Sequence, residues 1–261
     1  MMTGSAPLPG DGPIAAAGDG RVMVLGVPFA VCSFERAVEH IGDMIDAARP
    51  RHLVLANAHT LNLAYDDPAY RRVLQTASLV LRDGVGVELA MRLAGQRPHH
   101  NFVGTDFVPH LLAALGRREL RVFLFGAEPG VADAAARALV RQAPNVRVVG
   151  TAAGRGAFAR VVQLVRAARP HVLLVALGNP LQERWIHDNL ARLGVPLSIG
   201  VGALFDYLAG RVRRAPGWML QLRAEWLFRL VVEPRRLWRR YLMGNPRFVW
   251  RVFRSRRREQ W

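Results

Sequence analysis

The chain alternates short hydrophobic runs with segments in which apolar residues recur at helical spacing. Most runs are too continuously apolar for a sheet with one solvated face, and this pattern is typical of parallel strands covered by helices on both faces. The predicted strands are residues 52–56, 78–81, 121–125, 146–149, 171–177 and 196–201, and the clearest helical patterns are residues 68–76, 131–142, 158–168 and 181–193. We therefore expect βαβ units that build a Rossmann-like, mostly parallel α/β body.

Polar and glycine-rich residues follow the ends of several predicted strands. Ligands of open α/β sheets bind at this edge, because backbone N–H groups and helix N-termini are exposed there. The binding candidates at strand ends are Asn57, Thr60, Gly84, Gly86, Gly126, Asn179, Gln182 and Glu183, to which a further loop adds Gly104, Thr105 and Asp106. Several loops could therefore face one crevice.

Asp83 is the leading catalytic candidate. It follows a predicted strand directly, and the glycines at 84 and 86 allow a ligand to approach the backbone closely. A carboxylate in such a place can act as a general base. The alternative is that Asp83 caps a helix beginning near Val85.

Helix capping offers an equally simple explanation for other polar residues. Residues 126–130 either cradle a phosphate or form a plain strand-to-helix turn, and Asn179 either binds a sugar or uracil group or caps the next helix. Thr105 and Asp106 could also be caps. We interpret Asp67, which precedes a proline, as a cap, and the eight histidines lack metal-binding spacing, so no metal site is predicted.

Positive charge is concentrated in residues 211–261. This segment holds 15 of the 36 basic residues and three of the 20 acids, a net charge of +12 within a total of +16. Five of the six tryptophans also lie there, and amphipathic rings among cations suit the interface between water and an anionic membrane. The alternatives are a nucleic-acid-binding arm and a solvated helix that packs its aromatic rings inward.

We divide the chain into a disordered tail (1–20), the Rossmann-like body (21–210) and a basic, helical, membrane-associating appendage (211–261). No apolar run reaches the roughly 18 residues that span a bilayer. Cys32 is the only cysteine and no signal-peptide pattern is present, so we expect a cytoplasmic protein.

Three arginines of the appendage, Arg229, Arg236 and Arg239, would lie near one another on a continuous helix. Guanidinium groups bind phosphate oxygens in a bidentate fashion, so this cluster could face a diphosphate. A solvated face with a general attraction to anionic lipid is the alternative.

Several motifs occur together in the order found in the WecG/TagA/CpsF glycosyltransferases, which the chain resembles over about residues 22–248. They are ANAHT at 56–60, Asp67-Pro68, LVLRDGVG at 79–86, GTD at 104–106, LGNPLQERW at 177–185, GVGALFD at 200–206, RRAPGW at 213–218 and residues 225–238.

The resemblance implies an inverting, metal-independent bacterial glycosyltransferase without a cofactor. It would move a hexosyl or N-acetylhexosaminyl group from a UDP-sugar to a polyprenyl-diphosphate-linked acceptor, at the inner face of the plasma membrane, in cell-surface polysaccharide or wall polymer synthesis. Asp83 matches the family's proposed base, and Arg229, Arg236 and Arg239 match appendage arginines that reach the diphosphate.

Two positions depart from the family pattern. Leu55 stands where many members have Thr, and Asn101 stands where many have Arg, so whether Thr60 or a tail arginine compensates is open. The donor sugar, the acceptor glycan and a homo-oligomeric state are open as well. The alternative functions are a nicotinamide-dependent oxidoreductase, for which no GxGxxG stands out, and a basic nucleic-acid-binding module. We expect no nucleic-acid partner.

Overall fold

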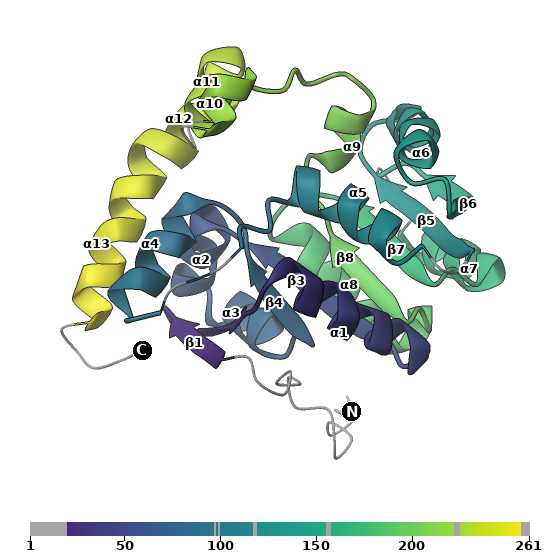
Figure 1. The fold of residues 1–261 in the computed structure, drawn as a ribbon, viewed down its shortest axis with the longest axis horizontal. Helices are drawn as coiled ribbons and strands as arrows, with labels where there is room; N and C mark the ends of the chain where they lie inside the picture. The colour runs from purple at the N-terminus through teal and green to yellow at the C-terminus, as the bar shows by residue number, and fades with distance from the viewer. Residues whose placement is uncertain are drawn as a thin grey trace.

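Six parallel strands form the central sheet of the protein (Figure 1). The computed structural model describes residues 20–96, 98, 100–116, 119–154, 158–221 and 225–256, with the backbone alone at Leu220, Gln221 and Arg236. The sheet order is β4-β3-β8-β7-β5-β6. Its strands are β3 (Arg51–Ala56), β4 (Leu79–Arg82), β5 (Leu120–Gly126), β6 (Val146–Ala152), β7 (Val172–Ala176) and β8 (Leu197–Gly200). The expected parallel α/β fold is confirmed, with a strand at each of the six predicted positions.

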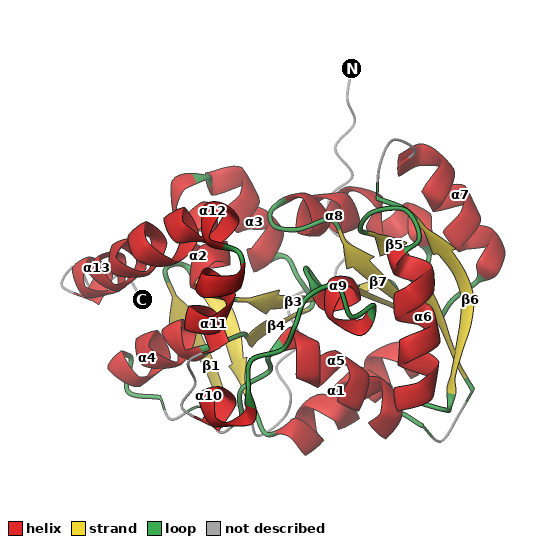
Figure 2. Ribbon diagram, turned by 90° about the horizontal axis from the view of Figure 1, so that it is seen from above, coloured by secondary structure: helices red, strands yellow, loops and turns green. Residues whose placement is uncertain are grey.

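Helices cover both faces of this sheet (Figure 2). The helices of the body are α1 (Phe34–Asp46), α2 (Ala58–Asp66), α3 (Pro68–Gln75), α4 (Val85–Leu93), α5 (Gly104–Ala114), α6 (Val131–Gln142), α7 (Phe158–Ala168), α8 (Leu181–Leu193) and α9 (Leu204–Leu208). Alternate residues of one strand point to opposite faces, so Leu53 and Leu55 pack with α1, α5 and α6, whereas Val54 and Ala56 pack with α2, α3 and α4. The layered arrangement leaves the carboxyl edge of the strands for the loops that carry the candidate site.

An antiparallel hairpin, which the sequence analysis did not predict, precedes α1. Its strands are β1 (Gly20–Val24) and β2 (Val27–Val31), joined through Leu25 and Gly26, which both have positive φ. Val24, Val27 and Phe29 are fully buried in the core beside α3 and α4. Gly20 therefore begins a strand, while residues 1–19 of the expected N-terminal tail lie outside the described residues.

The C-terminal segment is helical, and its last helix packs on the body. It contains α10 (Gly217–Gln221), α11 (Glu225–Val232), α12 (Pro234–Trp238), the π-helical turn η1 (Arg239–Met243) and α13 (Gly244–Arg256). Phe248 and Val252 of α13 are buried in the core formed with α2 and α4. No helix within the described ranges is long and apolar enough to cross a membrane. The boundary at 210/211 stays a prediction.

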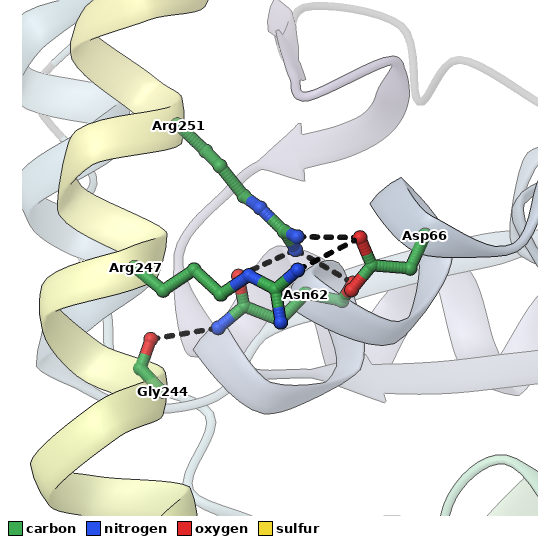
Figure 3. Close-up of polar contacts among 5 residues, drawn as sticks. All are labelled: Asn62, Asp66, Gly244, Arg247 and Arg251. Atoms are coloured by element: carbon green, nitrogen blue, oxygen red, sulfur yellow. Dashed lines mark hydrogen bonds and ion pairs between the residues drawn. The ribbon is translucent and has the colours of Figure 1, made fainter.

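A buried arginine joins α13 to α2 (Figure 3). Arg251, which is 2 % exposed, donates to the backbone and side-chain oxygens of Asn62 at 2.9 and 3.0 Å and pairs with Asp66 at 2.5 Å. Asn62 in turn donates to the carbonyl of Gly244 at 2.7 Å. The aromatic and basic residues of this helix are thus divided between a docking face and an exposed face.

Candidate active site

Asp83 follows β4 at the carboxyl edge of the sheet. Its backbone N–H donates to the carbonyl of Ala56 at 2.9 Å, and its Oδ2 accepts a hydrogen bond from Asn57 Nδ2 at 3.1 Å. The helix α4 is instead capped by Gly84, which has φ +87° and contributes no side-chain bond. Asp83 is therefore tied to the end of β3 rather than serving as the cap that the sequence left open.

The protein around Asp83 favours its protonated form. Burial raises the pKa of this carboxyl, while the hydrogen bond from Asn57 and the positive charges of Arg240 and Arg229 act in the opposite direction. The residue as a whole is half-buried. A desolvated carboxylate beside cationic groups has the properties of a general base.

Asn57 and Thr60 form a capping box at the start of α2. Asn57 Oδ1 accepts from the backbone N–H groups of His59 and Thr60 at 3.1 and 3.2 Å, and Thr60 Oγ1 accepts from the Asn57 N–H at 3.3 Å. The cap fixes the rotamer of Asn57, so that its amide N–H₂ points to Asp83. Thr60 is fully buried and acts within this cap.

A second polar group lies after β7, and its centre is the buried Glu183. Its two oxygens accept hydrogen bonds from Asn179 and Gln182, both at 2.7 Å, and from the hydroxyl of Tyr70 at 2.9 Å. Gln182 Oε1 accepts from the N–H groups of Gly178 and Gly202 at 3.2 and 3.0 Å. This group joins the loops after β7 and β8, and sequence reasoning found Asn179, Gln182 and Glu183 but missed Tyr70.

Helix α8 does not use Asn179 as its cap. Pro180 is the N-cap residue and contributes no side-chain bond, whereas the amide of Asn179 donates to Glu183. Asp67, in contrast, caps α3 as predicted, because its carboxylate accepts from the N–H groups of Ala69 and Tyr70 at 3.0 Å.

Three of the remaining glycine candidates, Gly86, Gly104 and Gly126, are closely packed. A Cβ at Gly126 would lie 2.4 Å from the carbonyl of Ala176, and one at Gly86 would lie 3.1 Å from Ala58 Cβ, so neither position has room for a side chain without a shift. Gly104 approaches Leu55 in the same way, at 3.1 Å from its Cδ1. Ligand contacts of Gly84, Gly86, Gly104 and Gly126 stay predictions.

Thr105 and Asp106 lie in the first turn of α5, and neither caps it, because the N-cap residue is Val103 without a side-chain bond. Thr105 Oγ1 is buried and has no hydrogen-bond partner among the residues that the structure describes. Asp106 forms an ion pair with Arg214, which precedes α10. This pair links α5 to the C-terminal segment.

The C-terminal helices bring arginines toward Asp83. Arg229 and Arg240 act electrostatically on Asp83, and Arg240 also acts on His59, whose pKa burial lowers to about 4. Arg239 is exposed and lies over the ring of Trp238, and the side chain of Arg236 falls outside the described residues. The sequence missed Arg240 because a break at Pro234 and the π-helical turn interrupt the assumed continuous helix.

Comparison with known proteins decides the family. The sequence profile described as "Glycosyl transferase WecG/TagA/CpsF family" matches residues 22–261. The chain belongs to this family. It is 32 % identical over 198 residues to the N-acetylglucosaminyldiphosphoundecaprenol N-acetyl-β-D-mannosaminyltransferase of Bacillus subtilis (strain 168), covering 76 % of this chain and 77 % of the relative.

Other relatives extend this match along nearly the whole chain. A Staphylococcus aureus (strain NCTC 8325 / PS 47) protein of the same name is 28 % identical over 244 residues, which cover 91 % of this chain and 94 % of that protein. Membership of the WecG/TagA/CpsF family selects the glycosyltransferase interpretation over the oxidoreductase and the nucleic-acid-binding module. The matched residues include both polar groups and the C-terminal helices of this WecG/TagA/CpsF protein.

Proposed function

We propose that this protein transfers a sugar from a UDP-sugar to a polyprenyl-diphosphate-linked acceptor, with inversion at the anomeric carbon and without a metal ion. The product would enter bacterial cell-surface polysaccharide or wall polymer synthesis. The observation that carries the proposal is the desolvated Asp83 carboxyl, held by Asn57 within reach of positive charge from Arg229 and Arg240. The relatives' name, which specifies a diphosphoundecaprenol-linked N-acetylglucosamine, supports the lipid-linked acceptor.

The proposed step is a single displacement. Asp83 accepts the proton of the acceptor hydroxyl while that oxygen forms a bond to the anomeric carbon, and the bond from this carbon to the UDP oxygen breaks on the opposite side. Attack from the side opposite the leaving group inverts the configuration. A carboxyl with a raised pKa is closer to the operating pH and is a better proton acceptor than an exposed one.

Cations of the C-terminal helices would stabilise the leaving diphosphate. Arg229 and Arg240 are the described tail arginines whose charge acts at Asp83, and stabilisation of developing negative charge is commonly a large part of catalysis. We assign this role to these two residues and keep Arg236 and Arg239 as further candidates. The other candidates for binding or ordering the donor and acceptor remain Asn57, Thr105, Asp106, Asn179, Gln182 and Glu183.

Peripheral attachment to the inner face of the plasma membrane is the second part of the proposal. Large apolar side chains on α10, α11 and α13 are exposed, among them Trp218 at 61 %, Val231 at 72 % and Trp250 at 55 %. The basic residues of the same segment add attraction to anionic lipid. A lipid-linked acceptor would then reach the site without leaving the bilayer surface.

The assignment of Asp83 is tested by Asp83→Asn. Transfer is expected to fall by about 10²- to 10⁴-fold, since the amide cannot accept the proton. The measurement is the rate of product formation with a soluble short-chain lipid-diphosphate-sugar acceptor, and Asp43→Asn on the exposed face of α1 is the control. Near wild-type transfer by folded Asp83→Asn would show that this base assignment is wrong.

The substrate class is tested with a panel of UDP-sugars against lipid-diphosphate acceptors. We expect one transferred N-acetylhexosaminyl or hexosyl unit by mass and an inverted anomeric configuration by NMR, with the rate unchanged by EDTA. A retained configuration, or a requirement for a divalent cation, would contradict the mechanism.

A further inference from the structure

The segment 100–103 passes beside the end of β4 and is firmly held there. The backbone N–H of Phe102 donates to the carbonyl of Arg82 at 3.2 Å. The ring of Phe102 is 1 % exposed and packs edge-on against Phe107, with centroids 4.9 Å apart. Asn101 therefore sits at a defined position next to the turn that carries Asp83.

The side chain of Asn101 binds both sequence neighbours of Asp83. Its Oδ1 accepts from the backbone N–H of Gly84 at 3.0 Å and from Arg82 Nη1 at 3.3 Å. One carboxamide oxygen thus holds the residue before and the residue after the proposed base. Gly84 has a positive φ, which favours glycine. This turn conformation directs its N–H toward Asn101.

Arg82 is itself locked by a buried ion pair. Its Nη1 lies 3.0 Å from Glu88 Oε2, and the two side chains are only 4 and 5 % exposed. Glu88 belongs to the first turn of α4, and its other oxygen pairs with Arg92 at 2.7 Å. The end of β4, the turn at Asp83 and the start of α4 are consequently connected through Arg82, Glu88 and Asn101.

We propose that Asn101 is a positioning residue, which uses its side-chain oxygen and the Arg82–Glu88 pair to set the direction of the Asp83 carboxylate. The role rests on the proposed function, in which Asp83 is the base. Asp83 is tied to β3 through its own N–H and Oδ2, and Asn101 restrains the opposite side of the same turn. The contacts of Arg82 with Asn101 and Glu88 restrain the turn through geometry, in addition to the charges of Arg240 and Arg229 that act on the Asp83 carboxyl.

Two substitutions of Asn101 separate this role from direct contact with a substrate. Asn101→Asp keeps an acceptor oxygen for Gly84 and Arg82 but removes the N–H₂ donor, whereas Asn101→Leu keeps the size and removes both. We expect Asn101→Asp to retain transfer within about threefold and Asn101→Leu to lower kcat by about 10- to 100-fold with little change in KM, because small misplacements of reacting groups cost up to about 10²-fold.

The contrary pattern would overturn the proposal. If Asn101 binds the donor through its amide, both variants lose activity, KM for the UDP-sugar rises, and the added charge of Asn101→Asp makes that variant the worse one. Asn145→Leu, which removes another half-buried side-chain hydrogen bond far from Asp83, is the matched control and should leave kcat unchanged. Asn101→Ala is the second variant if Asn101→Leu folds poorly.

Hydrogen exchange gives a test that does not depend on the reaction. The Gly84 amide should exchange slowly in the wild type and in Asn101→Asp, and at least about tenfold faster in Asn101→Leu. Equal exchange in all three proteins would contradict the restraint even if no UDP-sugar is accepted. Loss of transfer in Asp83→Asn together with wild-type behaviour of Asn101→Leu would leave the base assignment intact and refute only the role of Asn101.

Discussion

At the scale of single residues, Glu183 shows how burial and hydrogen bonding oppose each other. Burial raises its pKa to about 7, although hydrogen bonds from Gln182, Tyr70 and Asn179 favour the ionised form. The side-chain amide of Gln182 is used at both ends, because its N–H₂ donates to Glu183 and its oxygen accepts from two loop N–H groups. The loops after β7 and β8 therefore depend on a carboxyl group that titrates near neutral pH.

We predict that Glu183 makes the protein less stable as the pH rises from about 4.5 to about 7. In this window the folded state binds a proton that the unfolded state has released, so the free energy of unfolding falls, by on the order of 1–3 kcal/mol. Urea unfolding of wild type and Glu183→Gln at pH 5 and pH 8 measures it. The buried His52, whose pKa is lowered to about 3, is present in both proteins, so its contribution to the pH dependence cancels in the comparison. Parallel pH dependences would contradict the prediction.

At the scale of elements, the docking of α13 on α2 depends on Arg251 more than on its neighbour Arg247. Both approach Asp66, but Arg251 is buried and makes two further bonds to Asn62, whereas the Arg247 side chain is 61 % exposed and 3.5 Å from the carboxylate. Ion pairs in solvent contribute little, while a buried group that loses its partner is costly.

Arg251→Leu is accordingly expected to lower the free energy of unfolding by about 2–3 kcal/mol, through loss of the bonds to Asn62 and Asp66. Arg247→Leu, the matched change one turn earlier, should alter it by less than about 0.5 kcal/mol. Chemical unfolding followed by tryptophan fluorescence compares the two. Equal losses would mean that α13 is not docked through Arg251.

At the scale of the whole molecule, the C-terminal segment both completes the core and presents an apolar, basic surface. Phe248 and Val252 pack inside, whereas Trp250 and Phe253 of the same helix are 55 and 49 % exposed. Truncation before Arg211 would uncover the core as well as remove this surface, so surface substitutions give the cleaner test.

Trp250→Ser with Phe253→Ser is predicted to weaken binding to vesicles containing anionic lipid by about tenfold or more, since two aromatic side chains no longer enter the interface. Flotation or sedimentation of vesicles at several salt concentrations measures this. The double variant Val140→Ser with Leu164→Ser, which changes exposed apolar residues on α6 and α7, should bind as the wild type does. Equal losses of vesicle binding in both double variants would show that Trp250 and Phe253 do not form a specific membrane-binding face.

The sequence pattern predicted those strands and caps that are formed by residues close together along the chain. The continuous apolar runs at 171–177 and 196–201 became β7 and β8, and Asp67 before Pro68 became the cap of α3. The β1–β2 hairpin was missed, because its alternating residues follow a glycine-rich stretch that we interpreted as a tail. The roles of Arg229, Arg236 and Arg239 at a diphosphate stay predictions, and the structure adds Arg240, whose charge acts on Asp83.

The sequence by itself determined the parallel α/β sheet, the strand-end position of Asp83 and the concentration of charge near the C-terminus, because periodicity, the residues that directly follow a strand and composition are local properties of the chain. Only the tertiary structure decided that Asn57 holds Asp83, that Tyr70 donates to Glu183, and that Asn101 and Arg82 brace the turn. These contacts join residues from different elements, and their existence depends on how the strands and helices pack rather than on any spacing along the chain.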